Sequence, residues 1–299
     1  MQSSREIQER LENLGMIDHV VRSMRAMSAI RWRRANHALQ AVQRYAAQVL
    51  AQLSLAVSLP TPLVRDPSRS GKERLNRVGL IVISSDHGLC GPFNTVLFHT
   101  ADVYIQRWRA EGRSVELIAL GEYARRYYCD RAGLCHLLWS HRFPLTHAVS
   151  FIETREIWQM VERLYQAQDL DELYLVYNYF IAFGRYKQRL VRLLPPELTP
   201  MEMEPDARPL MGSDAAELQE FLLFEHLALQ LYLGLVESMV SEHSARLQAM
   251  DAAKSNIDER SGELERAYHI VRQQGITEEM LEIASGAQSL GGTTTYPSL

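Results

Sequence analysis

The turn SSDHGLCGPFN, residues 84–94, holds the residue types that most readily carry chemistry in this chain. Gly88 and Gly91 precede a helical stretch, where free backbone amides can hold a phosphate. The turn matches neither phosphate-binding pattern, GxGxxG or GxxxxGK[ST], and no Lys follows the glycines. Cys90 has His87 nearby, but a reactive thiolate also needs a stabilising environment and a positioned base. We therefore interpret the segment as a structural turn with a buried Cys90.

Cysteine and histidine also gather further along the chain. Cys129 and Cys135 enclose five residues, and His136, His141 and His147 follow. A zinc site takes four ligands in closely spaced pairs, which this spacing does not supply, so we predict packing roles and no metal or cofactor. We expect Cys129 to end a helix and Cys135 to begin a strand. The odd count of 3 cysteines provides no disulfide framework and indicates a reducing compartment.

These residues lie in a middle region that alternates extended and helical patterns. RVGLIVISSD, residues 77–86, is a β-branched run typical of a strand buried on both faces. We predict further strands at 114–120, 135–141, 172–182 and 188–195, and helices at 93–109, 122–133 and 151–166. Repeated strand–helix units predict an α/β domain with a mostly parallel sheet and crossover helices.

The two ends of the chain are predicted to be long helices. All but one of the 11 prolines fall between Pro60 and Pro209, and both flanking stretches repeat apolar residues at helical steps. In the first stretch these residues are Ile7, Leu11, Leu14, Ile17, Val21, Met24, Met27 and Ile30; in the second they run from Leu218 through Leu235 and Met250 to Met280 and Ile283. Such helices reach about 80 to 110 Å, so they bury their stripes against each other or inside a partner. We predict an antiparallel coiled coil.

Charge and sequence composition divide the chain into four regions. They are an N-terminal helix (1–58), a central domain with linkers (59–212), a C-terminal helix (213–290) and a tail (291–299). Residues 1–58 hold 8 Arg against 4 acidic residues, whereas residues 214–290 hold 5 basic against 14 acidic residues. Opposite charge favours pairing of the two helices. Because the whole chain has a net charge of -4, nucleic acid is not an expected partner.

The apolar run at 221–240 has the length of a membrane span but contains Glu225, His226, Gln230 and Glu237. A helix held between a sheet and a second helix explains it better. The start MQSSREIQERLENLG has no apolar core like that of a signal peptide. We therefore expect the protein to stay on the side of the membrane where it is made.

Five blocks resemble the gamma subunit of F-type ATP synthases, in the order found in that family. They are REIQERLENL, RSMRAMSAIRWRRA, SSDHGLCGPFN, SEHSARLQAMDAAKSNIDE and ITEEMLEIASGA, and together they extend over nearly the whole chain. Departures are MIDHVVRS at 16–23, His87 and Pro92 in the turn where the family has Arg and Gly, and a tail that continues past Leu290. They indicate a divergent branch.

The resemblance implies long terminal helices in an antiparallel coiled coil beside a central α/β domain. It also implies a rotor inside a ring of three alpha and three beta subunits, with its foot on the epsilon subunit and the membrane c ring. Such a subunit performs no catalysis and couples proton or sodium flow to ATP synthesis or hydrolysis. It is a peripheral membrane protein on the cytoplasmic face of the bacterial plasma membrane.

The resemblance further assigns four contacts with the beta subunit, at Met24, Arg246, Gln273 and Thr277. Each has a plainer alternative. Met24, like Met27, suits a coiled-coil seam. Arg246 suits a solvated helix charge, and Gln273 with Thr277 suits a surface pair four residues apart. The tail 291–299, rich in Gly and Thr, is expected to be flexible and to leave the ring rather than plug it.

Two other classes of protein remain as alternatives. A nucleotide-binding enzyme with coiled-coil arms would need ligand affinity in the middle domain, which has no phosphate loop. A free tethering coiled coil would form a stable homodimer.

Overall fold

The computed structural model describes residues 4–57, 76–131, 133–143, 149–167, 170–197 and 215–291. The chain divides into two compact units, each containing part of both terminal helices. We call residues 4–26 and 250–291 the coiled-coil unit, and the described residues of 27–249 the sheet unit. The predicted boundaries at 58/59 and 212/213, the linkers and most of the tail lie outside the described residues.

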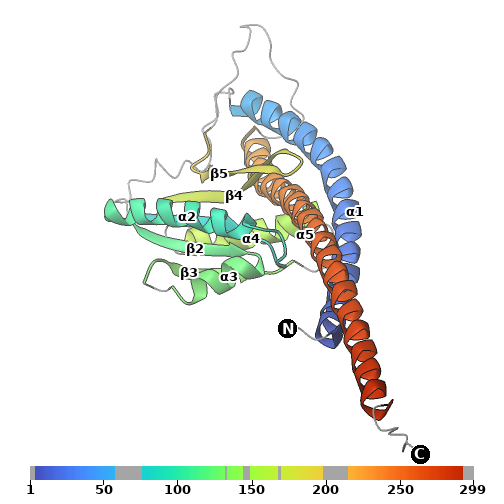
Figure 1. The fold of residues 1–299 in the computed structure, drawn as a ribbon. Coiled ribbons are helices and arrows are strands. Elements are labelled where there is room, and N and C mark those ends of the chain that lie inside the picture. The colour runs from blue at the N-terminus through green and yellow to red at the C-terminus, as the bar shows by residue number, and fades with distance from the viewer. Residues whose placement is uncertain are drawn as a thin grey trace, which may run out of the picture. The chain divides into compact units, whose positions relative to one another are not determined.

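The sheet unit contains the predicted five-stranded sheet (Figure 1). Its elements are β1 (Arg77–Ile83), α2 (Phe93–Ala110), β2 (Ser114–Leu120), α3 (Glu122–Cys129), β3 (His136–His141), α4 (Phe151–Ala167), β4 (Glu172–Ala182) and β5 (Arg185–Leu194). The strand order is β3-β2-β1-β4-β5, and only the β4–β5 pair is antiparallel. The mostly parallel sheet is confirmed, with β5 starting three residues earlier than predicted because a tight turn at Gly184 (φ 70°) returns the chain at once.

Each face of the sheet is covered by helices (Figure 1). Helices α2 and α3 cover one face, where Leu97, Ile105 and Tyr128 pack on the inner strands. Helix α4 and the long C-terminal helix α5 (Ala215–Gly291) cover the other, where Trp158 and Leu231 are fully buried. The central strand β1 is apolar on both faces because water reaches neither of them.

The apolar run at 221–240 lies in α5 and packs on two sides. Leu231 faces the sheet, while Val236 and Val240 pack against α1 (Ser4–Val57). Gly234 lets the helix approach the sheet, since an added Cβ would lie 2.8 Å from a methyl group of Leu175. Helix α5 is the one described helix long and apolar enough to cross a membrane, but 67% of that window is buried inside the structure. The prediction of a core helix is confirmed.

Burial along α1 follows a seven-residue repeat. One set of buried positions is Ile7, Val21, Ser28, Ala35, Val42, Val49 and Ala56, and the second includes Leu39, Ala46 and Leu53. The predicted stripe was wrong at Ile17, Met27 and Ile30, which are 51%, 47% and 51% exposed. Successive steps of three residues turn away from a seam that repeats every 3.5 residues.

Helices α1 and α5 run antiparallel, as predicted. In the coiled-coil unit, Asp18 pairs with Lys254 at 3.2 Å and Arg25 pairs with Asp251. In the sheet unit, the Tyr45 hydroxyl donates to Glu225 at 3.2 Å. Residue numbers thus rise along one helix as they fall along the other. Burial acts to raise the pKa of Asp18, but hydrogen bonds from Lys254 and Arg22 outweigh it and lower that pKa.

Candidate functional site

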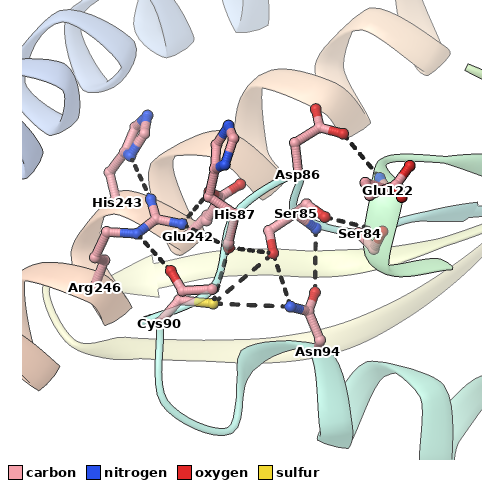
Figure 2. Close-up of polar contacts among 11 residues, drawn as sticks. Ser84, Ser85, Asp86, His87, Cys90, Asn94, Glu122, Glu242, His243 and Arg246 are labelled. Atoms are coloured by element: carbon pink, nitrogen blue, oxygen red, sulfur yellow. Dashed lines mark hydrogen bonds and ion pairs between the residues drawn. The ribbon is translucent and has the colours of Figure 1, made fainter. Parts of the chain in front are cut away.

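The loop between β1 and α2, residues 84–92, is closed by its own side chains (Figure 2). The backbone N–H of Ser85 donates to Asn94 Oδ1 at 3.1 Å, and Asn94 Nδ2 donates to Ser85 Oγ at 2.7 Å. The Ser85 hydroxyl donates to the carbonyl of His87 at 2.8 Å. Asn94 stands in the first turn of α2, so the loop and the start of that helix form one hydrogen-bonded structure.

Arg246 of α5 holds this loop from the other side (Figure 2). Its Nε donates to the carbonyl of Gly88 at 3.1 Å, and its Nη2 donates to the carbonyl of His87 at 2.9 Å. Nη2 also pairs with Glu242 at 2.6 Å, and Nη1 lies 3.2 Å from His243 Nδ1. The side chain is buried, so the alternative of a solvated helix charge is wrong. We call Arg246, Glu242, His243 and the two loop carbonyls the arginine clasp.

The electrostatics of the arginine clasp favour a neutral His243. Burial is the main cause that lowers the pKa of His243 to about 3, and the positive charges of Arg246 and Arg31 act in the same direction. A neutral ring with an unprotonated Nδ1 can accept the bond from the guanidinium. Burial raises the pKa of Glu242, although the Arg246 charge opposes this rise.

We expect the arginine clasp to make folding sensitive to pH between 6.5 and 5. The unfolded chain protonates its histidines near pH 6.5 while His243 stays neutral in the folded chain, so stability falls as pH falls through this range. The loss attributable to His243 is at most about 2 kcal/mol over 1.5 pH units. Urea unfolding of the wild type and of His243→Gln at both pH values measures it. A pH dependence that is the same in both proteins would contradict this assignment.

The loop offers little for catalysis. Burial is the main cause that raises the pKa of the Cys90 thiol, which disfavours a reactive thiolate. The expectation of a buried Cys90 is confirmed. The backbone N–H of Phe93 donates to the Cys90 carbonyl at 3.4 Å and that of Val96 to the Pro92 carbonyl at 3.0 Å, so neither amide is free for a phosphate. The arrangement suits a rigid connection between α5 and the sheet.

A second set of contacts ties the loop to α3. Asp86 accepts hydrogen bonds from the N–H of Glu122 at 2.8 Å and of Phe143 at 2.9 Å. Ser84 Oγ accepts one from the N–H of Ala124 at 2.8 Å. Gly121 stands at the start of α3 with φ of 105°, close against the Ser84 carbonyl. The loop is therefore fixed by α2, α3 and α5 together.

Sequence reasoning missed Asn178, which joins three elements. Its Nδ2 donates to the backbone carbonyl of Phe93 at 3.0 Å, and the backbone carbonyl of Asn178 accepts from the Ser241 hydroxyl at 3.0 Å. Gln188 Nε2 donates to Asn178 Oδ1 at 2.9 Å. The signal was an amide inside the otherwise apolar strand ELYLVYNYFIA, because a fully buried amide needs partners.

The other predicted contact residues belong to the coiled-coil unit. Met24 is half-buried on α1, and Gln273 and Thr277 are exposed on α5. The Thr277 hydroxyl donates to the Gln273 carbonyl at 2.9 Å, so the two residues contact through side chain and backbone. The contact of these three residues with a beta subunit stays a prediction.

The predicted cysteine positions are partly confirmed. Cys129 ends α3 but is exposed, so packing was the wrong role for it; Cys135 is buried and precedes β3 by one residue. His136 and His141 lie on β3, and His147 is outside the described residues. Within the parts of the chain that the structure describes, no three His, Cys, Asp or Glu residues are grouped for a metal.

Comparison with known proteins decides the family. The family model described as ATP synthase matches residues 3–290. An ATP synthase gamma chain of Geobacter sp. (strain M21) is 31% identical over 299 residues, covering 98% of this chain and 100% of the relative. The chain belongs to the ATP synthase gamma chain family. The gamma chain of Pelotomaculum thermopropionicum is also 31% identical, with 97% and 100% covered.

Solved structures agree on the fold. A chain of the Euglena gracilis mitochondrial ATP synthase, in a structure of OSCP, F1 and c-ring, aligns with a TM-score of 0.67 at 17% identity, covering 99% of this chain and 98% of that one. A chain of the Tetrahymena thermophila central stalk and c-ring gives 0.58 at 19% identity, covering 78% and 99%. These solved structures show the fold, and membership of the family makes this chain the gamma subunit of an ATP synthase, a non-catalytic subunit of that complex.

Proposed function

We propose that the chain rotates inside a ring of three alpha and three beta subunits and couples ion flow to ATP synthesis or hydrolysis there. Catalysis belongs to the beta subunits in this proposal. The rotor presents different surfaces to the three sites, so its rotation changes their relative affinities through differential contact. Its foot binds the epsilon subunit and the c ring, on the cytoplasmic face of the bacterial plasma membrane.

The observation that carries this proposal is the exposed end of α5. Asp18 pairs with Lys254, so the antiparallel register places Ser4 beside about residue 270 of α5, and no described residue of α1 lies opposite the rest of α5. Large apolar side chains nevertheless continue there, at Ile276, Met280, Leu281 and Ile283, and Met280 is 67% exposed. The apolar side chains at this helix end fit a sleeve in which the helix can turn, since apolar contacts are not directional.

Met24, Gln273 and Thr277 are the proposed contacts with beta subunits. Gln273 and Thr277 are on the exposed part of α5, where a surrounding subunit can reach their side chains. Arg246 is the fourth proposed contact with a beta subunit, but its guanidinium donates hydrogen bonds to the carbonyls of His87 and Gly88. Any effect of Arg246 on a partner is therefore expected to pass through the loop that it holds.

Sedimentation equilibrium and single-molecule rotation test the proposal together. The purified chain is mixed with alpha and beta subunits, and a bead is attached to an engineered exposed cysteine of the sheet unit. We expect one copy per ring of six subunits, and rotation of the bead on addition of ATP. A stable homodimer that ignores alpha and beta would support a tethering coiled coil. Nucleotide binding by the chain alone would support the enzyme alternative.

Met24→Lys is expected to reduce coupling between ion flow and ATP synthesis while the protein stays folded. Met24 is only half-buried, so a lysine there can keep its charge in solvent within this chain and add a charged contact with a neighbouring subunit. The measurement compares ATP synthesis per ion-driven turn with ATP hydrolysis in the reconstituted complex. Met27→Lys, at an exposed position on the same helix, is the control. Normal ion-driven synthesis in Met24→Lys would contradict the contact assignment.

A further inference from the structure

The outer edge of β5 carries a row of cations. Lys187 and Arg189 alternate along the strand and so share one face, and Arg185 stands beside the turn. All three are exposed. Arg189 lies over the ring of Tyr179, 5.3 Å from its centroid, which holds the guanidinium at the edge of the sheet.

These cations differ from several other exposed arginines, which form ion pairs with carboxylates. Arg107 pairs with Glu111, Arg126 with Glu122 and Arg260 with Glu263. Among the described residues, no ion pair within 4.0 Å involves Arg185, Lys187 or Arg189.

Other charges near the edge do not offset the row of cations. The positive charge of Arg189 acts to lower the pKa of Glu237, but Glu237 is buried and accepts a hydrogen bond from the Tyr177 hydroxyl at 2.7 Å. Residues 19–57 of α1 contain no acidic residue, and Trp32, which lies between Arg31 and Arg33, contacts Phe183 at the β4–β5 turn. The surface is thus basic from the turn along β5.

The strand that carries these cations is also an edge strand. β5 ends the strand order, and no other strand among the described residues pairs with its outer side. An edge strand presents free backbone N–H and C=O groups that another extended chain can use. Phe183 and Ile181 are exposed at the turn and add apolar area next to the edge.

We propose that the outer edge of β5 binds an extended acidic segment of a protein partner, which adds a strand to the sheet. Residues directly opposite each other on neighbouring strands interact, so Lys187 and Arg189 select acidic residues at alternate positions of the incoming strand. A second copy of this chain is disfavoured because its own β5 would bring like charges together. A lipid surface can neutralise the cations but cannot continue the hydrogen bonds of the sheet.

A synthetic peptide of alternating Glu and Val, labelled with fluorescein, tests this directly on the full-length chain by fluorescence anisotropy. We expect binding that weakens with salt and protects the amides of residues 185–194 from hydrogen exchange. Two comparison peptides should bind roughly tenfold more weakly or worse: one with Lys in place of Glu, and one with Pro in place of Val. The second keeps the charge but lacks an N–H at every other residue, which disfavours a regular ladder of hydrogen bonds.

The matched variants are K187E/R189E and R107E/R163E, which each reverse two exposed cations. The first should weaken peptide binding by roughly tenfold or more, and the second should leave it unchanged. If K187E/R189E folds poorly, K187Q/R189Q should still weaken binding several-fold. Unchanged binding by the β5 variants, equal binding of the proline peptide, or no binding by the wild type would overturn the proposal. So would binding only to phosphatidylserine vesicles. Each outcome is independent of whether the chain rotates.

Discussion

Arg246→Ala should lower the free energy of unfolding of the sheet unit by about 3 to 5 kcal/mol, because it removes one partner of a buried ion pair. The substitution leaves Glu242 without its 2.6 Å partner and the carbonyls of His87 and Gly88 without their donors. Urea unfolding measures the loss of stability. Hydrogen exchange should show that residues 84–94 lose protection first, since the arginine clasp holds them.

A double variant separates loss of the arginine clasp from loss of a partner contact. Arg246→Met combined with Glu242→Leu removes both charges, so it should be less destabilising than Arg246→Met alone. If Arg246 acted only by touching a beta subunit, the single variant would keep full stability and lose only assembly or ATPase turnover. Full stability of Arg246→Met, or equal losses in the single and double variants, would contradict the arginine clasp.

The elements of the fold were largely readable from local patterns. The run RVGLIVI can be buried on both faces only inside a covered parallel sheet, and it forms β1. The absence of proline allowed α1 and α5 to be predicted as long helices, which extend over 54 and 77 residues. Each of these signals is a local pattern along the chain, so it can be found in a single sequence without knowledge of the folded contacts.

The phase of the coiled coil was harder to predict than its existence. The seam of α1 includes the buried Ser28, and Asp18 lies beside that seam. A search for apolar residues misses both of these polar residues. Meanwhile Met27 and Ile30 are apolar but face outward. Polar seam residues are tolerated where a partner satisfies them, as Lys254 does for Asp18. Which residue provides that partner is set by the register of two helices that are far apart in sequence.

The candidate site depends on contacts that leave almost no trace in the sequence. Arg246 binds the Gly88 carbonyl across 158 positions, and every residue has a carbonyl. The resemblance singled out Arg246 but assigned it a contact with the beta subunit. The plainer alternative was a guanidinium that is exposed to solvent on the helix. Only the folded chain shows that the Arg246 guanidinium is buried and forms its hydrogen bonds within this protein. Asn178 was the one member of this region whose residue type could have signalled its role.

Gly121→Ala should be the most disruptive small substitution near the site, lowering the free energy of unfolding by at least about 3 kcal/mol. An added Cβ would lie 2.3 Å from the Ser84 carbonyl oxygen, a backbone atom that cannot move aside without shifting the end of β1. The backbone φ of 105° is also one that residues with a side chain rarely adopt. The loop begins at Ser84, so relief of the clash must displace it.

Gly112→Ala is the matched control, because Gly112 also has a positive φ, of 79°, but an added Cβ there would meet nothing within 4 Å. It should lose only about 1 to 2 kcal/mol from backbone strain. The difference between the two variants therefore isolates the contact between Gly121 and Ser84, and urea unfolding of both proteins measures it. Hydrogen exchange at Ala124, whose N–H donates to Ser84 Oγ at 2.8 Å, should accelerate in Gly121→Ala alone. Equal losses in the two variants would mean that the chain yields at Ser84 without strain, and that α3 does not help to fix the loop.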